Sequence, residues 1–496
     1  MPVFRFKRLD EAMIVLSLVA ILLCVVFFRP WSWDVTAYHL PFAARALGLS
    51  RFEQITPLET SRYDGFPVLW RYALAPGLIL DLPRLYVFPN LAAALAIAFS
   101  SVSALGKPWY AVLACTLCFP ISLLGFSTPY QDYFTNVIAL AGAMHLFRWI
   151  YGAHSFYGSS DRWRLLLASL FLIIAANIKI QGLMIAVAIS FVGFLYWIVL
   201  FFATKRRAVF VPVARSKSSP VGNVMFLVLA ICIIVSVFLQ PINNLLRFGN
   251  PLYPVRVFGL NGTEERYSTP LEYLPQVPVV TSVISHFLST TEIDPYLLSG
   301  GEAKPSLLRS GDMNIIRKPS ATNYSPRTGG TIGPIYIGLL IVALFGVVKT
   351  IRNKELLNHF SGQVSLVLFS LLVVISAMPQ SMELRYFLIA IYIPALVAIL
   401  VPSSESTEKV AKVLICSGLI IGILHILVYG RHILLPAIGL NLNKELPSSQ
   451  QCLALGELST NSDGRRMLTM RGKVLGDTVF KCRIVINPEV YIKYER

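Results

Sequence analysis

Asp34 lies at a position where a catalytic role explains an acidic side chain better than a structural role does. Asp34 follows the first long apolar segment by a few residues, within Trp31-Ser-Trp-Asp-Val-Thr-Ala-Tyr-His-Leu-Pro41. A carboxylate among aromatic side chains can take a proton from a hydroxyl group as a general base. The alternative is a helix N-cap, but a helix from Val35 would hold Pro41 in its interior. We therefore favour the chemical role, although the two roles are compatible.

Three more charged residues stand at the ends of apolar segments. Asp132 would begin a helix, where the macrodipole alone favours an acidic side chain, so a structural and a functional role are equally good. Lys179 lies between two apolar segments, where it would either extend to the membrane surface or pair with a phosphate. Arg385 has the planar set of donors that suits phosphate, and Glu383 is its alternative partner.

Aromatic and polar side chains near these charges could hold a substrate. If the segment after Asp34 is helical, Tyr38 shares its face and His39 lies beside it. Arg247-Phe-Gly-Asn-Pro-Leu-Tyr-Pro254 has the Gly and Pro pattern of a tight turn. For the tryptophans and tyrosines, anchoring at the membrane interface is an equally ordinary role. The candidate substrate-binding residues are Trp33, Tyr38, His39, Tyr63, Trp70, Asn250 and Tyr253.

Composition places these residues in a membrane protein. Apolar residues make up 55% of the chain, charged residues 14%, and the mean hydropathy is +0.65, which excludes a water-soluble domain of this size. Apolar runs without barrel-type alternation predict helices. We predict an all-α polytopic protein of about eleven transmembrane helices. The predicted spans are 12–29, 84–104, 108–127, 132–151, 163–178, 182–203, 221–240, 331–349, 362–378, 384–402 and 411–430.

The short loops predict the orientation. With the N-terminus inside, most basic loop residues fall inside, as the positive-inside rule requires. They include Lys107, Arg148, Arg164, Lys349, Arg352, Lys409 and Lys412. Much of the net charge of +17 is then topological, and no nucleic-acid partner is expected. The same scheme puts Asp34, Asp132, Lys179 and Arg385 on the outside.

Four regions follow from this scheme. They are a transmembrane region 1–240 with a first outside loop 30–83, an outside loop domain 241–330, a transmembrane region 331–430, and an outside tail 431–496. Within the first loop, 42–52 and 67–82 predict interfacial helices. In the tail, the alternating patterns at 466–470 and 479–486 predict a few strands, so a small α+β unit is one option for the tail.

The seven cysteines divide between the spans and the tail. Cysteines in the spans are expected to pack as small apolar residues. Cys452 and Cys482 fall in the outside tail, where a disulfide is an option in an oxidising compartment. The chain has no dinucleotide fingerprint, P-loop or Gly-x-Ser-x-Gly elbow. Because the site faces outward, away from cytosolic nucleotides, an activated substrate would have to arrive on a lipid.

Taken together, these motifs resemble those of GT-C-type integral-membrane glycosyltransferases, the class of the protein O-mannosyltransferases and the lipid A aminoarabinose transferase. The resemblance covers most of residues 1–430. It rests on Asp34 with Tyr38-His-Leu-Pro41, Phe66-Pro-Val-Leu-Trp70, Asp132, Lys179-Ile-Gln-Gly182, Gly249-Asn-Pro-Leu-Tyr-Pro254 and Arg385-Tyr386. Many members carry two neighbouring acidic residues in the first loop, whereas Asp34 has none nearer than Glu53. The requirement for a divalent metal is therefore undecided at this point, and no other cofactor is expected.

The resemblance implies sugar transfer from a polyprenyl-phosphate donor to an outward-facing glycan, lipid or protein acceptor. Asp34 would act as general base, with Asp132 in the same catalytic site. Lys179 and Arg385 would stabilise the leaving phosphate. The expected place is the bacterial inner (plasma) membrane, with the active site on its periplasmic face and the lipid bilayer as partner.

Two other functions stay open. A transporter or flippase for a lipid-linked glycan would favour charges near the bilayer midplane, and the predicted spans hold almost none. An O-antigen-type polymerase or ligase would concentrate basic residues in its large outside loop. Here 241–330 is nearly balanced, with eight Lys and Arg against seven Asp and Glu.

Overall fold

The structure of the protein is a computed structural model of the whole chain. The described residues are 7–28, 39, 42–43, 46–47, 64–80, 82–154, 162–207, 238–251, 253, 333–376, 387–439, 450, 456–460, 466–471 and 491–495.

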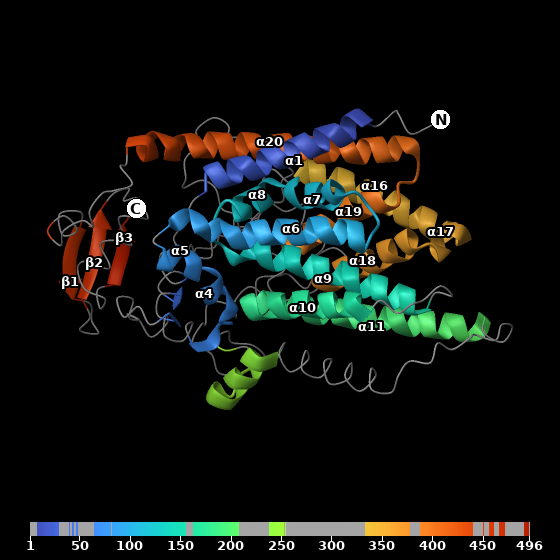
Figure 1. The fold of residues 1–496 in the computed structure, drawn as a ribbon, viewed down its shortest axis with the longest axis horizontal. Helices are drawn as coiled ribbons and strands as arrows, with labels where there is room; N and C mark the ends of the chain where they lie inside the picture. The colour runs from blue at the N-terminus through green and yellow to red at the C-terminus, as the bar shows by residue number, and fades with distance from the viewer. Residues whose placement is uncertain are drawn as a thin grey trace, which may run out of the picture.

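Long apolar helices form a single bundle in the described part of the chain (Figure 1). In Figure 1, α1 and α20 lie side by side along one edge, and α10 and α11 lie along the opposite edge. The described residues are mostly helical, as predicted. The bundle helices are α1 (Lys7–Val26), α6 (Phe88–Ser103), α7 (Trp109–Leu117), α8 (Pro120–Phe126), α9 (Gln131–His154), α10 (Arg162–Ile178), α11 (Ile180–Arg207), α16 (Gly333–Arg352), α18 (Phe360–Ser376), α19 (Leu388–Leu400) and α20 (Glu405–Gly439).

These helices indicate a membrane protein. Five of the described helices are long and apolar enough to cross a bilayer, and the bent pair α7–α8 would be a sixth. Shorter apolar helices, such as α10, α18 and α19, accompany them. Each predicted span outside 221–240 coincides with a helix or with the bent pair. The count of about eleven spans stays a prediction.

The predicted span 108–127 is a pair of helices with a sharp bend between them. Helix α7 ends at Leu117, α8 starts at Pro120, and the two axes meet at 98°. Proline lacks the N–H that would continue the helix, and its ring disfavours a helical residue before it. Phe119 is accordingly extended, with φ −107° and ψ 129°. The bend therefore follows from Phe119-Pro120.

Two glycines of α20 fit against this bend. A Cβ on Gly418 would collide with the Cys118 carbonyl oxygen, and one on Gly422 would collide with the Leu123 side chain. Gly418 and Gly422 are four residues apart, so they share one helix face. This small-xxx-small pattern lets helices approach closely in membranes. The bend between α7 and α8 is thus held by the close approach of α20.

The two ends of the bundle differ in charge. At one end, Lys412 pairs with Asp10 (3.0 Å) and Glu408 (2.9 Å), which joins the starts of α1 and α20. Lys107 donates to the Ile399 carbonyl, and Lys349 donates to that of Pro402. This end, called the basic end, also holds α17 (Lys354–Asn358). The predicted inside residues therefore gather at one end, as the positive-inside scheme expects.

The opposite end, called the site end, holds short elements before α6. These are α4 (Leu69–Ala73), α5 (Ala75–Ile79) and the 3-10 helix η2 (Pro83–Val87). The predicted interfacial stretch 67–82 is thus two short helices rather than one. Residues 238–248 are also helical, and α20 runs to Gly439.

The tail contains a small sheet. Strands β1 (Gly456–Thr460) and β2 (Arg466–Arg471) pair antiparallel, and β3 (Tyr491–Glu495) pairs parallel to β2. The prediction of strands is confirmed at 466–470, whereas 479–486, Cys452 and Cys482 lie outside the described residues.

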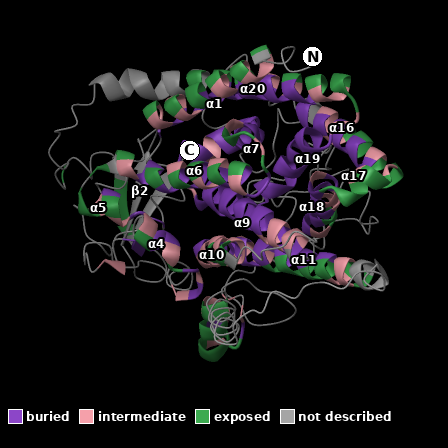
Figure 2. Cartoon of the chain, turned by 45° about the vertical axis from the view of Figure 1, so that its right-hand side comes forward, coloured by how far each residue is buried: buried purple, intermediate pink, exposed green. Residues whose placement is uncertain are grey.

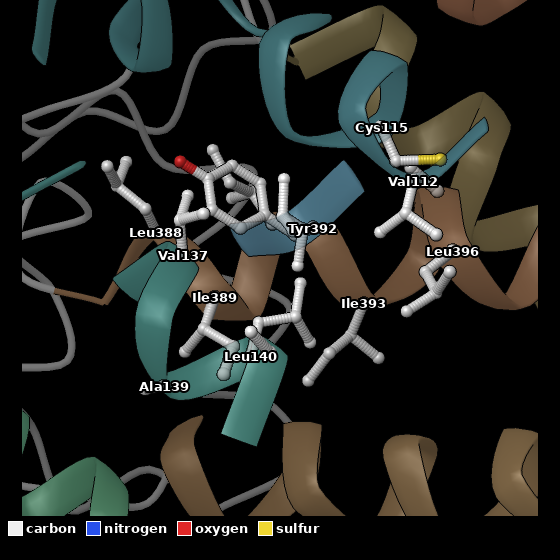
Figure 3. Close-up of a cluster of buried hydrophobic side chains, with 14 of the residues drawn as sticks. Val112, Cys115, Val137, Ala139, Leu140, Leu388, Ile389, Tyr392, Ile393 and Leu396 are labelled. Atoms are coloured by element: carbon white, nitrogen blue, oxygen red, sulfur yellow. The ribbon is translucent and has the colours of Figure 1, made fainter. Parts of the chain in front are cut away.

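The core runs through α9 and α19, which are buried along most of their lengths (Figure 2). Figure 3 shows Val137 and Leu140 of α9 beside Ile389 and Ile393 of α19. Helices α1, α6 and α11 carry exposed apolar residues outward, as expected for helices that face lipid. The cysteines Cys24, Cys115, Cys118 and Cys416 are free and buried, which confirms their predicted packing role.

The packing of α20 on the bend predicts the effect of a single methyl group. Gly418→Ala should lower the free energy of unfolding by roughly 1–3 kcal/mol, because the added carbon meets backbone that cannot rotate away. Gly152→Ala is the matched control, since a Cβ there meets nothing within 4 Å. Denaturant unfolding in detergent measures both. Equal stability of the two variants would contradict the close approach.

Candidate functional site

A buried ion pair lies at the site end. Asp132, in the first turn of α9, pairs with Lys179, and only 6% and 12% of the two side chains are exposed. Lys179 is the one residue between α10 and α11, and its carbonyl accepts the Leu183 N–H (3.2 Å) as α11 begins. The two charged residues that the sequence singled out separately are therefore partners.

Gly182 fixes the turn that carries Lys179. A Cβ there would collide with the Ala175 carbonyl oxygen of α10 and would lie 2.7 Å from the Thr135 Cγ2 of α9. Only a residue without a side chain lets the start of α11 approach both helices. The Lys179-Ile-Gln-Gly182 motif thus has a local structural cause, because its glycine positions the lysine next to Asp132.

Asn136 links the Asp132 turn to the start of α19. Its Nδ2 donates to the Asp132 carbonyl (2.8 Å), and its Oδ1 accepts the Ile389 N–H (3.0 Å). One of the unpaired N–H groups at the start of α19 is satisfied in this way. The segment that follows Arg385-Tyr386 is therefore fastened one helical turn from Asp132.

The first loop reaches the same region through aromatic contacts. The His39 and Tyr130 rings meet edge to face with centroids 6.5 Å apart, and Tyr130 precedes Asp132 by two residues. Trp70 packs on Phe134 at 5.7 Å, and α4 packs on α10. Trp70 is only 2% exposed, so its ring supports the site from within rather than offering a face to a substrate.

Arg71 is a buried cation that the sequence analysis missed. It is 7% exposed, it donates to the Phe66 carbonyl (3.2 Å), and its guanidinium lies 5.7 Å from the Phe42 ring centroid. A cation over an aromatic face gains electrostatic attraction. The signal in the sequence was an arginine inside the apolar run Phe66-Pro-Val-Leu-Trp-Arg71.

A network of side-chain amides joins the first loop to the turn at 249–253. Asn244 donates to the carbonyls of Gly65 (2.9 Å) and Tyr253 (3.0 Å), and Gln240 donates to that of Asp64 (3.1 Å). Gly249 has φ 69°, which favours glycine.

Asn250 and Tyr253 are both positioned by this turn. Asn250 is fully buried, and the Tyr253 ring stacks on Phe248 at 3.9 Å. Asn244 thus holds Gly65, which directly precedes the 66–70 motif, against the turn that carries Tyr253.

Five of the predicted site residues lie outside the described part of the chain: Trp33, Asp34, Tyr38, Tyr63 and Arg385. Of the predicted residues that are described, His39, Trp70, Asp132, Lys179, Asn250 and Tyr253 all lie at the site end. In the part of the chain that is described, no three His, Cys, Asp or Glu side chains gather as metal ligands.

The ion pair limits what Lys179 can do alone. A carboxylate in contact with the ammonium cancels most of its charge at a distance. A phosphate that binds Lys179 must therefore compete with Asp132 or add to the pair.

The Asp132–Lys179 ion pair predicts how substitutions of either residue change the folding stability of the protein. Lys179→Met or Asp132→Asn alone should cost about 3–5 kcal/mol of folding stability, because each leaves a buried charge without its partner. The double variant Asp132→Asn/Lys179→Met should recover much of that loss. Unfolding of all four proteins in detergent, as a double-mutant cycle, measures the coupling. Additive losses would show that the two side chains do not depend on each other.

Comparison with protein-family models, with curated proteins and with solved structures finds no match to this chain.

Proposed function

We propose that this protein is a membrane glycosyltransferase that moves a sugar from a polyprenyl-phosphate donor to an outward-facing glycan, lipid or protein acceptor. The observation that carries the proposal is the meeting of distant motifs at the site end. His39 contacts Tyr130, Asp132 pairs with Lys179, and Asn244 holds the first loop against the 249–253 turn. These are the segments on which the resemblance to GT-C-type enzymes rests.

The proposed chemistry needs one base and a cationic place for phosphate. Asp34 takes the proton of the acceptor as it attacks the sugar carbon. The bond from that carbon to the phosphate oxygen breaks, and the phosphate leaves with its negative charge. Arg385 stabilises that charge, while Asp132 holds Lys179 in place beside it. A phosphate leaving group needs no strong acid, so a single carboxylate suffices where glycosidases use two.

A lipid-linked donor suits the architecture. The apolar helices indicate a lipid bilayer around the bundle, and a prenyl chain would lie in that bilayer while its phosphate reaches the site end. With the basic end in the cytosol, the site end is on the outer face. In a bacterium this places the reaction on the periplasmic face of the inner membrane.

The sharpest prediction concerns Asp34. Asp34→Asn keeps the size and the N-capping ability of the side chain but removes its basicity. Transfer should fall by roughly 10²-fold or more, in line with the usual contribution of a general base. Purified protein in lipid, given a panel of polyprenyl-phosphate sugars, is assayed for release of prenyl phosphate. Glu405→Gln, an exposed acid-to-amide change at the basic end, is the matched control.

Two outcomes would overturn parts of this proposal. An Asp34→Asn protein as active as wild type would show that Asp34 is not the general base. That result would not contradict the fold. No prenyl phosphate release from any donor would remove sugar transfer itself. Arg385→Ala should raise the KM for the donor with little change in the KM for the acceptor, which separates a phosphate ligand from a base.

One observation favours a second candidate, a transporter or flippase for a lipid-linked glycan. Transporters commonly place substrate sites at interrupted helices, and α7–α8 is bent by 98°. Sealed vesicles distinguish the two functions, because a flippase moves the intact lipid-linked sugar across the bilayer without releasing prenyl phosphate.

A further inference from the structure

The helical residues 238–248, drawn green below α4 in Figure 1, turn a polar side toward the protein. Asn244 is 1% exposed and donates to the carbonyls of Gly65 (2.9 Å) and Tyr253 (3.0 Å). Gln240, one turn earlier, also donates to the Gly65 carbonyl (3.3 Å). Side-chain amides therefore hold this side of the helix to the site end, where a surface helix of a water-soluble protein would have an apolar stripe.

The opposite side of the same helix is apolar and exposed. Its exposed apolar residues are Phe238, Leu239, Ile242, Leu245 and Leu246. At 3.6 residues per turn, these five residues lie within an arc of roughly 120° that is centred opposite Gln240 and Asn244. Leu246 is 81% exposed. The helix is thus amphipathic in the reverse sense, with its polar side inward and its apolar face outward.

Hydrocarbon is the surrounding that suits this arrangement. A continuous apolar face is unfavourable in water, whereas in a bilayer the outward side of a helix is apolar. Exposed apolar residues on α10 and α11, such as Leu170 and Phe194, mark the lipid-facing side of the bundle. The exposed polar residues Asn243 and Arg247 are four apart and follow one edge of the apolar face. An apolar face with a polar edge matches the boundary between acyl chains and headgroups.

Arg247 supplies a positive charge at that edge. Its side chain is 52% exposed and lies 3.9 Å from Asp64 Oδ1, and its guanidinium is 5.2 Å from the Phe248 ring centroid. An exposed ion pair of this length contributes little stability. The planar set of guanidinium donors suits a phosphate, which is the charged group that phospholipids place at the boundary with the acyl chains.

We propose that helix 238–248 lies in the bilayer leaflet at the site end, with its apolar face among phospholipid acyl chains and Arg247 on a lipid phosphate. The lipid-facing surface then continues to Leu246, past the predicted end of a span at 240. Through Asn244 the helix holds Gly65 and Tyr253 close to headgroup depth. This role does not depend on which reaction the site end carries out.

Spin labels on the full chain test the position of the helix. A cysteine-free chain carrying Leu246→Cys or the matched control Asn243→Cys is labelled with a nitroxide and placed in vesicles of phosphatidylcholine and phosphatidylglycerol. Oxygen concentrates in hydrocarbon and a nickel chelate stays in water, so the ratio of their collision rates with the label reports its depth. The ratio at residue 246 should be several-fold higher than the ratio at residue 243.

Two results at residue 246 would overturn the proposal. A ratio equal to that at residue 243 would place the apolar face in water. A label that neither oxygen nor the chelate reaches would show that protein covers the face, whether a second copy or another segment of this chain.

The role of Arg247 has its own control. With the label at residue 246, Arg247→Gln should lower the oxygen-to-nickel ratio, because the helix loses its contact with the phosphate. Asp64→Asn removes the ion pair but keeps the guanidinium, so the ratio should not change. An equal fall in both variants would assign Arg247 to the ion pair alone, and no fall in either would show that it binds no phosphate. Either result would overturn its proposed role.

Discussion

The arrangement of the site end depends on one ion pair between two helices and a turn. Asp132 and Lys179 are both nearly buried, so neither charge can remain without the other except at a large desolvation cost. The pair fixes the start of α9 against the α10–α11 turn. Through Asn136 the same turn of α9 holds the start of α19. Three segments far apart in the sequence are placed by a few polar contacts in apolar surroundings.

Close backbone contacts make this arrangement possible. Gly182 lets α11 begin against α9 and α10, and Gly418 lets α20 lie on the α7–α8 bend. Hydrophobic attraction between helices is weak in lipid, so association rests on such close packing and on hydrogen bonds across helices. The polar contacts at the site end and the glycine contacts on the bend therefore belong to one mechanism of assembly.

Much of the fold was predictable from the sequence, but the site was predictable only in part. Apolar length predicts the helices, and the loop charges predict which residues share an end, because both effects are local. The pairing of Asp132 with Lys179 was not predicted, since each residue had its own local explanation and their contact depends on how three helices pack. Arg71 was missed because a buried arginine looks like any interfacial arginine in the sequence. Phe119-Pro120 could have predicted the bend from the sequence. The high hydropathy of residues 108–127 instead favoured one continuous span.

The central claim is that the end carrying Asp132 and Lys179 faces the outside, since every proposed role follows from that side. A cysteine-free chain with a single cysteine added at an exposed position tests it in intact cells. A membrane-impermeant maleimide should label Arg84→Cys at the site end without lysis, and should label Lys354→Cys and Ser404→Cys at the basic end only after lysis. The reverse pattern would place the ion pair in the cytosol and contradict the account.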